Sequence, residues 1–580
     1  MERVIETTRL TETIQKVIAQ ERRQREAQAR ENSFHLIPQG ERQKCIESLL
    51  FFTLPNKFPV AVDKLIQQIE AGFGECNQAL RLEYLAFLVE LVLALRSLLP
   101  RWNLQSAERH GKSILTQARL EATADHLQAF IQRLAHHAPE AEAVILHRFQ
   151  VEAAARYEAE QAPEPEQAAK ALAGSSLGEF IENYCREISQ SQLRRIAEMR
   201  FSGETGTELS NDYAAFLQHT LYLGASFATT NPPLVNMAWD ILPGTWNPII
   251  DGIISNHPEA DVPHLAKLVT MEVVLEQLRL LRPIFLLNEG RMGSVCLQVN
   301  PGNHADSQAM VSDALFFYDL MRCHLNGGIP NVVFKLPGTQ AGLEACRDLT
   351  GRGIGVTITV NFGMFQHIPF AEAMSQGQSI YSNLVEMNGR LAFPVRDELL
   401  SKLEALSARG IEETAARQAA AWSGVIIAKR LYQALKERGI DQHRSKILIA
   451  SLRIYQGESY QALPTAFPDI TEITGARLLS IFPNVRYAYD HAAPIDIQPN
   501  QIEAPLPAGI MDILAHSEIF KQAYYIPGDD QRLKPEQEIT LQDEQGTFTW
   551  PPVYNTLTEF IKSYNTLMQR ISERKAQLMG

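Results

Sequence analysis

The chain has 580 residues, which exceeds one ordinary domain, so we expect a barrel-sized domain with additional domains. Apolar residues make up 45% and charged residues 21%, as is typical of a globular protein. The net charge of −13 argues against general nucleic-acid binding. The six cysteines form no CxxC pair, which suits a reducing cytosol and offers no zinc or other metal site.

The start of the chain shows no apolar signal region. The most apolar stretch, residues 84–100, contains Glu90 and Arg96, so it predicts a buried helix rather than a membrane span. We therefore expect a cytoplasmic protein that does not contact a membrane.

Residues 1–158 predict a helical N-terminal domain, because apolar residues recur there at helical spacing. Residues 159–176, rich in Ala, Pro, Glu and Gln, predict a linker. In residues 177–490, about eight short apolar runs alternate with helical stretches, which is the α/β pattern of a parallel (β/α)8 TIM barrel. Residues 491–580 predict a Pro-rich segment, a hairpin centred on Gly546, and a closing amphipathic helix that forms a helical tail.

The octapeptide VVFKLPGT, residues 332–339, is the strongest local signal for chemistry. Its first three residues predict a buried strand, which ends at Lys335 before Pro337 and Gly338 turn the chain. Burial disfavours an unpaired ammonium, and a neutral lysine amine can attack a carbonyl and form a Schiff base. The simpler interpretation is a surface lysine at a strand end.

Polar residues also follow the other predicted strands. In a parallel barrel such residues share one mouth, where active sites lie. A lysine, carboxylates, amides and two arginines suit carbonyl chemistry on an anionic substrate, because the planar guanidinium of arginine binds two phosphate oxygens at once. The strand-end residues beside Lys335 are Asp212, Asn231, Gln298, Asn300, Thr359, Asn361, Glu386, Arg390, Ser451 and Arg453.

Each of these residues has a plainer interpretation. Asp212 could cap the helix that follows it, and Asn231 could build a turn. Thr359 could face a helix, and Arg390 and Arg453 could form surface salt bridges.

Three segments of the barrel resemble the transaldolase family. FATTNPPL (residues 227–234) resembles the family's ATTNP segment, and VVFKLPGTQAGLEA (332–345) resembles the strand that bears the Schiff-base lysine. GIGVTITVNFGMFQ (353–366) resembles the next strand with its threonine. The likeness extends over about residues 205–490 and identifies the chain as an atypical long relative of the class I transaldolase and fructose-6-phosphate aldolase superfamily.

The resemblance implies a metal-free mechanism without a cofactor, acting on a sugar phosphate. Lys335 would form a Schiff base with a ketose or ketone, Asp212 would act in C–C cleavage, and Thr359 would hold the catalytic water. The residues implied to bind substrate are Asn231 for the donor hydroxyls and Arg390, Ser451 and Arg453 for the phosphate.

The sequence departs from the family pattern at two strands. Gln298 replaces a glutamate typical of transaldolases, and a glutamine can orient water but cannot relay a proton. Because fructose-6-phosphate aldolase also has glutamine there, aldol cleavage is as plausible as group transfer. Before Gly389 and Arg390, the usual proline position holds Glu386, which could supply a carboxylate near the lysine or point outward.

Two functions fit these observations. The first is a transaldolase or class I aldolase of carbohydrate metabolism, related to the pentose phosphate enzymes. The second is a non-catalytic, sugar-phosphate-binding regulatory protein on a retired barrel, in which bound ligand alters contacts of the N-terminal helices. Under either function the N-terminal helices could form a homo-oligomer.

Overall fold

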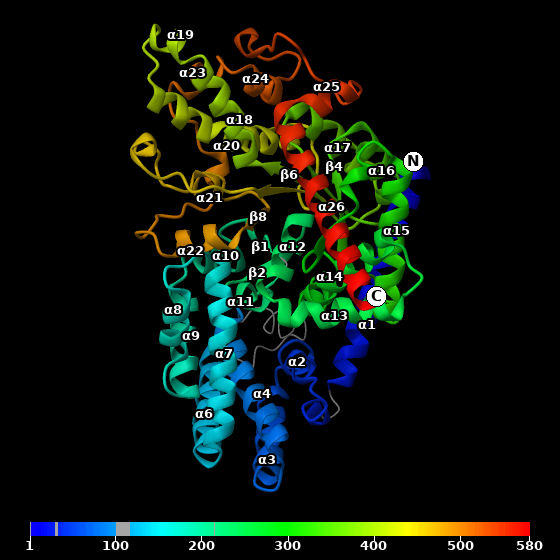
Figure 1. The fold of residues 1–580 in the computed structure, drawn as a ribbon, viewed down its shortest axis with the longest axis vertical. Helices are drawn as coiled ribbons and strands as arrows, with labels where there is room; N and C mark the ends of the chain where they lie inside the picture. Colours follow the sequence, from blue (N-terminus) through cyan, green and yellow to red (C-terminus); the bar gives the residue numbers. More distant parts are fainter. Residues whose placement is uncertain (1, 30–32, 100–115, 214, 580) are drawn as a thin grey trace.

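Eight parallel strands close into a barrel in chain order, which confirms the predicted (β/α)8 fold (Figure 1). The computed structural model describes residues 2–29, 33–99, 116–213 and 215–579. Every residue within the strands is buried, as their apolar runs predict. The strands are β1 (Glu208–Asn211), β2 (Ala225–Thr229), β3 (Val295–Gln298), β4 (Val332–Pro337), β5 (Val356–Thr359), β6 (Ser382–Met387), β7 (Ser445–Ala450) and β8 (Leu478–Ile481).

The register of the strands brings candidate site residues to the same end of the barrel. Gln298 at the end of β3 pairs with Lys335 on β4, and Pro337 on β4 pairs with Thr359 at the end of β5. Because parallel strands run in the same direction, their C-terminal ends meet at one mouth of the barrel.

Helices surround the barrel, and several begin at a side chain that caps their first turn. Asn231 caps α12, Asp261 caps α14 and Thr339 caps α16, each by accepting a backbone N–H. The helices of this region are α11 (Leu217–Tyr222), α12 (Pro232–Ile241), α13 (Pro243–Asn256), α14 (Val262–Leu287), α15 (Ser307–His324), α16 (Gln340–Gly351), α17 (Met364–Gln376), α18 (Asn388–Ser401), α19 (Leu403–Ser407), α20 (Glu413–Glu437), α21 (Pro468–Thr471) and α22 (Pro483–Asp490).

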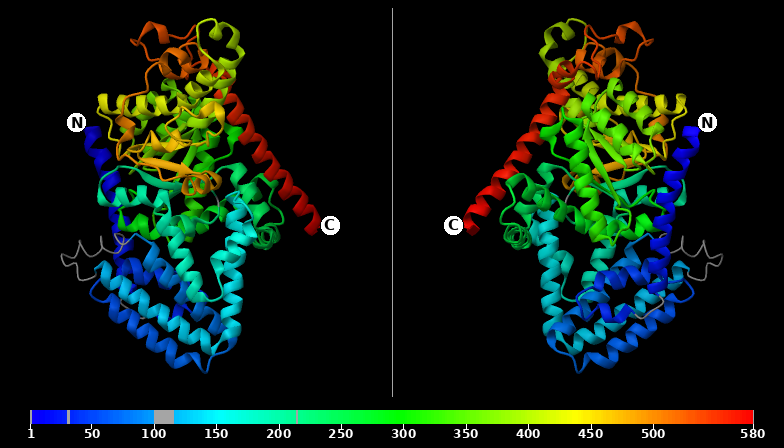
Figure 2. Two further views of the ribbon diagram at one scale, coloured as in Figure 1. Left: turned by 90° about the vertical axis from the view of Figure 1, so that its left-hand side faces the viewer. Right: turned by 90° about the vertical axis from the view of Figure 1, so that its right-hand side faces the viewer.

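The N-terminal region is helical, and it lies at one end of the long axis of the molecule (Figure 2). Its apolar helix α4 (Gln78–Ser97) packs against α6 and α7, as expected for a buried helix. Within the described ranges, no helix is both long and apolar enough to cross a membrane. The other N-terminal helices are α1 (Glu2–Gln28), α2 (Arg42–Glu47), α3 (Phe58–Phe73), α6 (Gln117–His137), α7 (Pro139–Ala159), α8 (Pro165–Ala173), α9 (Leu177–Gln190) and α10 (Gln192–Ser202).

Helix α1 leaves the other N-terminal helices and lies along loops at the end of the barrel opposite the mouth (Figure 2). The hydroxyl of Thr11 donates a 2.7 Å hydrogen bond to the backbone O of Gln378, just before β6. The buried Ile14 packs beside Gly353, just before β5. The first helix of the chain is therefore part of the packing of the barrel.

Two local predictions outside the barrel are wrong. The supposed linker contains α8, which packs against α7 and α9, because Pro165 starts a helix of strong helix formers with Leu172 on its buried side. The supposed hairpin is the short helix α25 (Glu544–Thr549), because the Asp543 side chain caps its first turn by accepting the Gly546 N–H at 2.9 Å.

The C-terminal region ends in the long helix α26 (Pro551–Met579), preceded by α23 (Ile510–Leu514) and α24 (Glu518–Tyr524). Helix α26 packs on α12, α13 and α14 at one side and on α18 at another, so it crosses the barrel near its mouth (Figure 1). This crossing places residues from the end of the chain beside the candidate site.

Candidate active site

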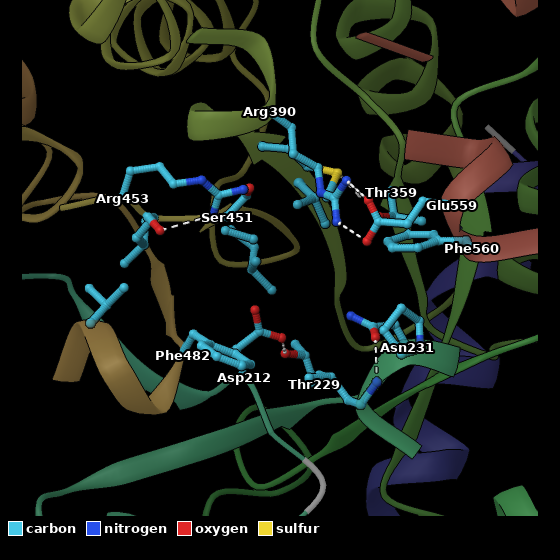
Figure 3. A pocket seen from close by; sticks show the side chains of 18 of the residues that line it. Asp212, Thr229, Asn231, Thr359, Arg390, Ser451, Arg453, Phe482, Glu559 and Phe560 are labelled. Atoms are coloured by element: carbon cyan, nitrogen blue, oxygen red, sulfur yellow. Dashed lines mark hydrogen bonds and ion pairs between the residues drawn. The ribbon is translucent and has the colours of Figure 1, made fainter. Parts of the chain in front are cut away.

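A cavity of about 560 Å³ opens at the C-terminal mouth of the barrel (Figure 3). Residues from β2, β4, β5, β6, α12, α18, α26 and the loops after β1 and β7 line this cavity, so the fold joins segments that are far apart in sequence. The predicted site residues among its lining are Asp212, Asn231, Lys335, Thr359, Arg390, Ser451 and Arg453.

Lys335 lies at the barrel end of this cavity and is only 6% exposed. Its Nζ donates a 2.9 Å hydrogen bond to the backbone O of Thr230 on the loop after β2. The alternative of a surface lysine is therefore wrong, because the ammonium group reaches the inside of a closed barrel. This contact fixes the position of the amine. It uses one N–H group, so the nitrogen can still attack a carbonyl through its lone pair once it is deprotonated.

Asp212 follows β1 and lies across the cavity from the distal arginines (Figure 3). Thr229 Oγ1 donates a 2.6 Å hydrogen bond to its carboxylate, and Ser480 Oγ lies 2.8 Å from the same threonine hydroxyl. Burial raises the pKa of Asp212 above its ordinary value, although the positive charge of Lys335 and the Thr229 hydrogen bond oppose the rise. The helix-cap alternative does not hold, because α11 begins only at Leu217.

Asn231 lines the cavity, and it caps a helix where the plainer interpretation placed a turn. Its Oδ1 accepts the Leu234 N–H at 3.0 Å and caps α12, while its amide nitrogen points toward the cavity (Figure 3). Thr359 faces the cavity, and its Oγ1 lies 3.6 Å from the sulfur of Met387. The alternative in which Thr359 faces a helix is therefore excluded.

The distal end of the cavity contains the two predicted arginines. Arg390 is paired with Glu559 of α26, so its salt-bridge alternative is correct, although the pair lines the cavity. The Arg453 guanidinium donates to the backbone O of Leu452 at 3.1 Å and packs on the ring of Phe393. Burial lowers the pKa of Arg453, and the nearby charge of Arg390 lowers it further.

Ser451 has an unusual backbone for a residue with a side chain. Its φ of +61° is in the left-handed region, and its Oγ is buried without a hydrogen-bond partner among the described residues. Strained backbone of this kind occurs at ligand sites, where the surrounding structure holds it in place.

Gln298 and Asn300 lie beside the main cavity. They line a small adjoining pocket that also includes Lys335, Thr359 and Leu557 of α26. The Oε1 atom of Gln298 is buried and has no hydrogen-bond partner among the described residues. Asn300 instead accepts the Gly302 N–H at 2.9 Å, which caps a short helical turn.

Glu386 and Asn361 are not part of the cavity. Val385 and Met387 point into it, so the alternation of side chains along β6 directs Glu386 to the outer face of the barrel. There Glu386 lies 2.8 Å from Nε2 of His367, whose Nδ1 lies 3.0 Å from the Asn361 amide. Glu386 therefore does not supply the carboxylate that Gln298 lacks.

Burial disfavours charge on both Glu386 and His367. Burial raises the pKa of Glu386 well above its ordinary value, with repulsion from Asp469 adding to the rise. Burial also lowers the pKa of His367 to about 3. A neutral acid beside a neutral imidazole can share a hydrogen bond without separating charge.

Two residues at or beside the site could not be identified from any sequence pattern. Glu559 is one of many polar residues on an amphipathic helix, and Asp469 belongs to the short helix α21. Both reach the site only through contacts between distant segments. Among the described residues, no three His, Cys, Asp or Glu side chains are grouped so that they could hold a metal ion.

The sequence of the barrel region matches a family model and several known proteins. Residues 217–476 match the family model described as Transaldolase/Fructose-6-phosphate aldolase. Transaldolase 1 of Streptomyces avermitilis is 27% identical over 168 residues, which cover 29% of this chain and 41% of that protein. The transaldolase of Mycobacterium ulcerans is 29% identical over 195 residues, covering 31% of this chain and 51% of that protein.

A probable transaldolase 2 of Bacillus cereus is 36% identical over 90 residues, which cover 15% of this chain and 40% of that protein. The chain thus spans about half, or less, of the length of these curated relatives. These matches confirm the resemblance read from the sequence: the barrel of this long chain is similar to the transaldolase/fructose-6-phosphate aldolase family.

Proposed function

We propose that this protein makes or breaks C–C bonds of ketose phosphates through a Schiff base on Lys335. The observation that carries the proposal is the position of this amine, buried at the barrel end of a cavity that Asp212 and Thr359 also line. The named relatives, which are transaldolases, support the same reaction class.

The first step uses the lysine as a nucleophile. The neutral Nζ of Lys335 adds to the ketone carbon, the former carbonyl oxygen leaves as water after taking up protons, and an iminium forms. Gln298 and Thr359 adjoin the lysine and would hold that water, since an amide and a hydroxyl can both donate and accept hydrogen bonds.

The second step breaks the C–C bond. The Asp212 carboxylate accepts the proton of the substrate's hydroxyl, the bond electrons move into the iminium, and an aldehyde leaves behind an enamine. A pKa raised by burial makes this carboxylate a stronger base than an exposed aspartate. An aldehyde acceptor then captures the enamine in a transfer reaction, or a proton does so in simple aldol cleavage. In both cases water hydrolyses the resulting iminium, which releases the ketone product and the amine of Lys335.

The remaining lining residues would hold the substrate. The amide nitrogen of Asn231 is placed for the donor hydroxyls, and the unpartnered hydroxyl of Ser451 is placed for a phosphate oxygen together with Arg453 and Arg390. This arrangement would orient the sugar with its carbonyl toward Lys335 and its phosphate toward the arginines.

Borohydride trapping tests the proposal. Wild-type protein incubated with fructose 6-phosphate and borohydride should gain a reduced adduct on the peptide that contains Lys335, and Lys335→Ala should gain none. Lys402→Ala, at an exposed lysine paired with Glu398, is the matched control and should behave as wild type. If the wild type gains no adduct, or if Lys335→Ala keeps it, the Schiff-base function is wrong. Calorimetric binding of the ketose phosphate without turnover would then favour the non-catalytic alternative.

A further inference from the structure

We propose that Glu559 is a specificity-determining residue, which competes with the phosphate of a substrate for Arg390 and so weakens the preference of this cavity for phosphorylated ligands. The inference deepens the proposed function, because it concerns which ligands enter the same cavity. It stands on the contacts that α26 makes with Arg390.

Glu559 accepts the hydrogen bonds that Arg390 would otherwise donate to a phosphate. Its two carboxylate oxygens accept hydrogen bonds from Nη1 at 2.7 Å and from Nη2 at 2.8 Å. This paired geometry is the same one by which a guanidinium holds two phosphate oxygens. The ring of Phe560 covers the face of the guanidinium at 5.4 Å, so α26 contacts both its edge and its face (Figure 3).

Helix α26 is anchored well beyond this pair. Arg574 binds Asp251 of α13 through two hydrogen bonds of 2.6 and 2.7 Å, and Arg570 pairs with Asp240 of α12 at 2.8 Å. Asn236 of α12 donates a 2.9 Å hydrogen bond to the backbone O of Ser563, one turn from Glu559. These contacts fix this part of α26 at the cavity, so the Glu559 carboxylate stays within reach of Arg390 and of a phosphate bound there.

The charges around the cavity determine how strongly Glu559 opposes the binding of a phosphate. The hydrogen bonds from Arg390 lower the pKa of Glu559, which keeps the carboxylate ionised at neutral pH. The distal end therefore combines the two guanidinium groups of Arg390 and Arg453 with one carboxylate. A phosphate must either displace Glu559 from Arg390 or bind beside its negative charge.

A ligand that ends in a neutral hydroxyl group instead of a phosphate is not repelled by the Glu559 carboxylate. It can use Ser451 and Arg453 while the ion pair between Arg390 and Glu559 stays intact. Glu559 thus weakens the binding of phosphorylated ligands and leaves the binding of unphosphorylated ones unchanged. Removing its charge should therefore raise the affinity for phosphorylated ligands relative to that for unphosphorylated ones.

Binding of inorganic phosphate, measured by calorimetry, tests this inference without any chemistry. Glu559→Gln keeps the shape of the side chain and removes its charge, and it should bind phosphate about tenfold more tightly than wild type. Glu573→Gln removes an equal charge from the same helix, where Glu573 contacts only Gln569 among its described partners, and it should bind phosphate as wild type does. Glu559→Ala, with a thermal-unfolding curve, serves as the second variant if Glu559→Gln folds poorly.

The second readout is the ratio of adduct formation with fructose 6-phosphate to that with fructose, under borohydride trapping. This ratio should rise about tenfold in Glu559→Gln and stay unchanged in Glu573→Gln. Phosphate binding that is equal or weaker in both Glu559 variants would overturn the inference, because Glu559 would then help to hold the anion or ignore it. If no variant forms an adduct but phosphate binding tightens, the Schiff-base function fails while the role of Glu559 stands.

Discussion

The carboxylate of Asp469 accepts a hydrogen bond of 2.9 Å from the backbone N–H of Arg453. Its second oxygen accepts a 3.0 Å hydrogen bond from the side-chain amide of Asn388. Asn388 begins α18, two residues before Arg390, so one buried carboxylate joins the segments that carry both arginines. We infer that Asp469 positions the distal end of the cavity without touching the ligand.

Asp469 gives a test of stability against pH. Burial raises its pKa to about 6 from an unfolded value of 3.8. Between these values the folded state binds more protons than the unfolded state, so the free energy of unfolding falls as pH rises through this window, by about 3 kcal/mol for this group. In Asp469→Asn that contribution disappears, and urea unfolding between about pH 4 and 6 should show a flatter pH dependence than wild type. If the free energy of unfolding had the same slope against pH in wild type and in Asp469→Asn, the raised pKa of Asp469 would be contradicted.

Asp212 should govern the acid side of the activity profile. Because burial raises its pKa, activity should fall as pH decreases through a value above the usual range of an aspartate. Asp212→Asn should lower kcat by ~10²–10⁴-fold and should still form the Lys335 adduct, because the amide keeps the shape but cannot accept the proton. The pH dependence of kcat/KM and borohydride trapping check both parts. Loss of the adduct in this variant would assign Asp212 to an earlier step.

Gly389 has no room for a side chain. A Cβ at this position would lie 2.5 Å from the backbone O of Ser451 and against Cγ of Arg453. Gly389→Ala should therefore push Arg453 away, cost ~1–3 kcal/mol in the free energy of unfolding, and raise KM for phosphorylated substrates. Gly252→Ala is the control, because a Cβ there meets nothing within 4 Å. Thermal unfolding and steady-state kinetics of the two variants make the comparison, and equal behaviour would show that the distal loop adjusts freely.

The N-terminal helix should stabilise the barrel through one buried ion pair. Arg282 of α14 is 1% exposed, and its Nε donates a 3.1 Å hydrogen bond to Glu21 of α1. Glu21→Gln would leave a buried guanidinium without its counter-charge and should cost ~3–5 kcal/mol in the free energy of unfolding. Glu12→Gln, at an exposed position on the same helix, should cost little. Chemical unfolding followed by barrel tryptophan fluorescence measures the difference. A small loss for Glu21→Gln would mean that α1 only lies against the barrel.

Much of the barrel and its buried lysine could be predicted from the sequence. Short apolar runs between helical stretches define β/α units, and in a parallel barrel the residues at the C-terminal end of each run lie near the mouth. This reasoning correctly gathered Lys335, Asp212 and Thr359 around one cavity. It also gave the helical N-terminal region, because periodic apolar residues are a local signal.

Other features depended on the tertiary structure. The direction of Glu386 follows the alternation of side chains along β6, and a shift of one residue in a strand boundary reverses that direction. The predicted linker and hairpin failed because capping and packing turned polar, flexible-looking segments into α8 and α25.

The sequence by itself determined the barrel and the place of its buried lysine, because short apolar runs and the strand that contains Lys335 are encoded locally. Only the tertiary structure decided what surrounds the distal end of the cavity. The contacts of Glu559 with Arg390 and of Asp469 with Arg453 join segments that are distant in the chain. Such contacts arise from the packing of α26 and α21 on the barrel, and no local pattern of residues specifies them.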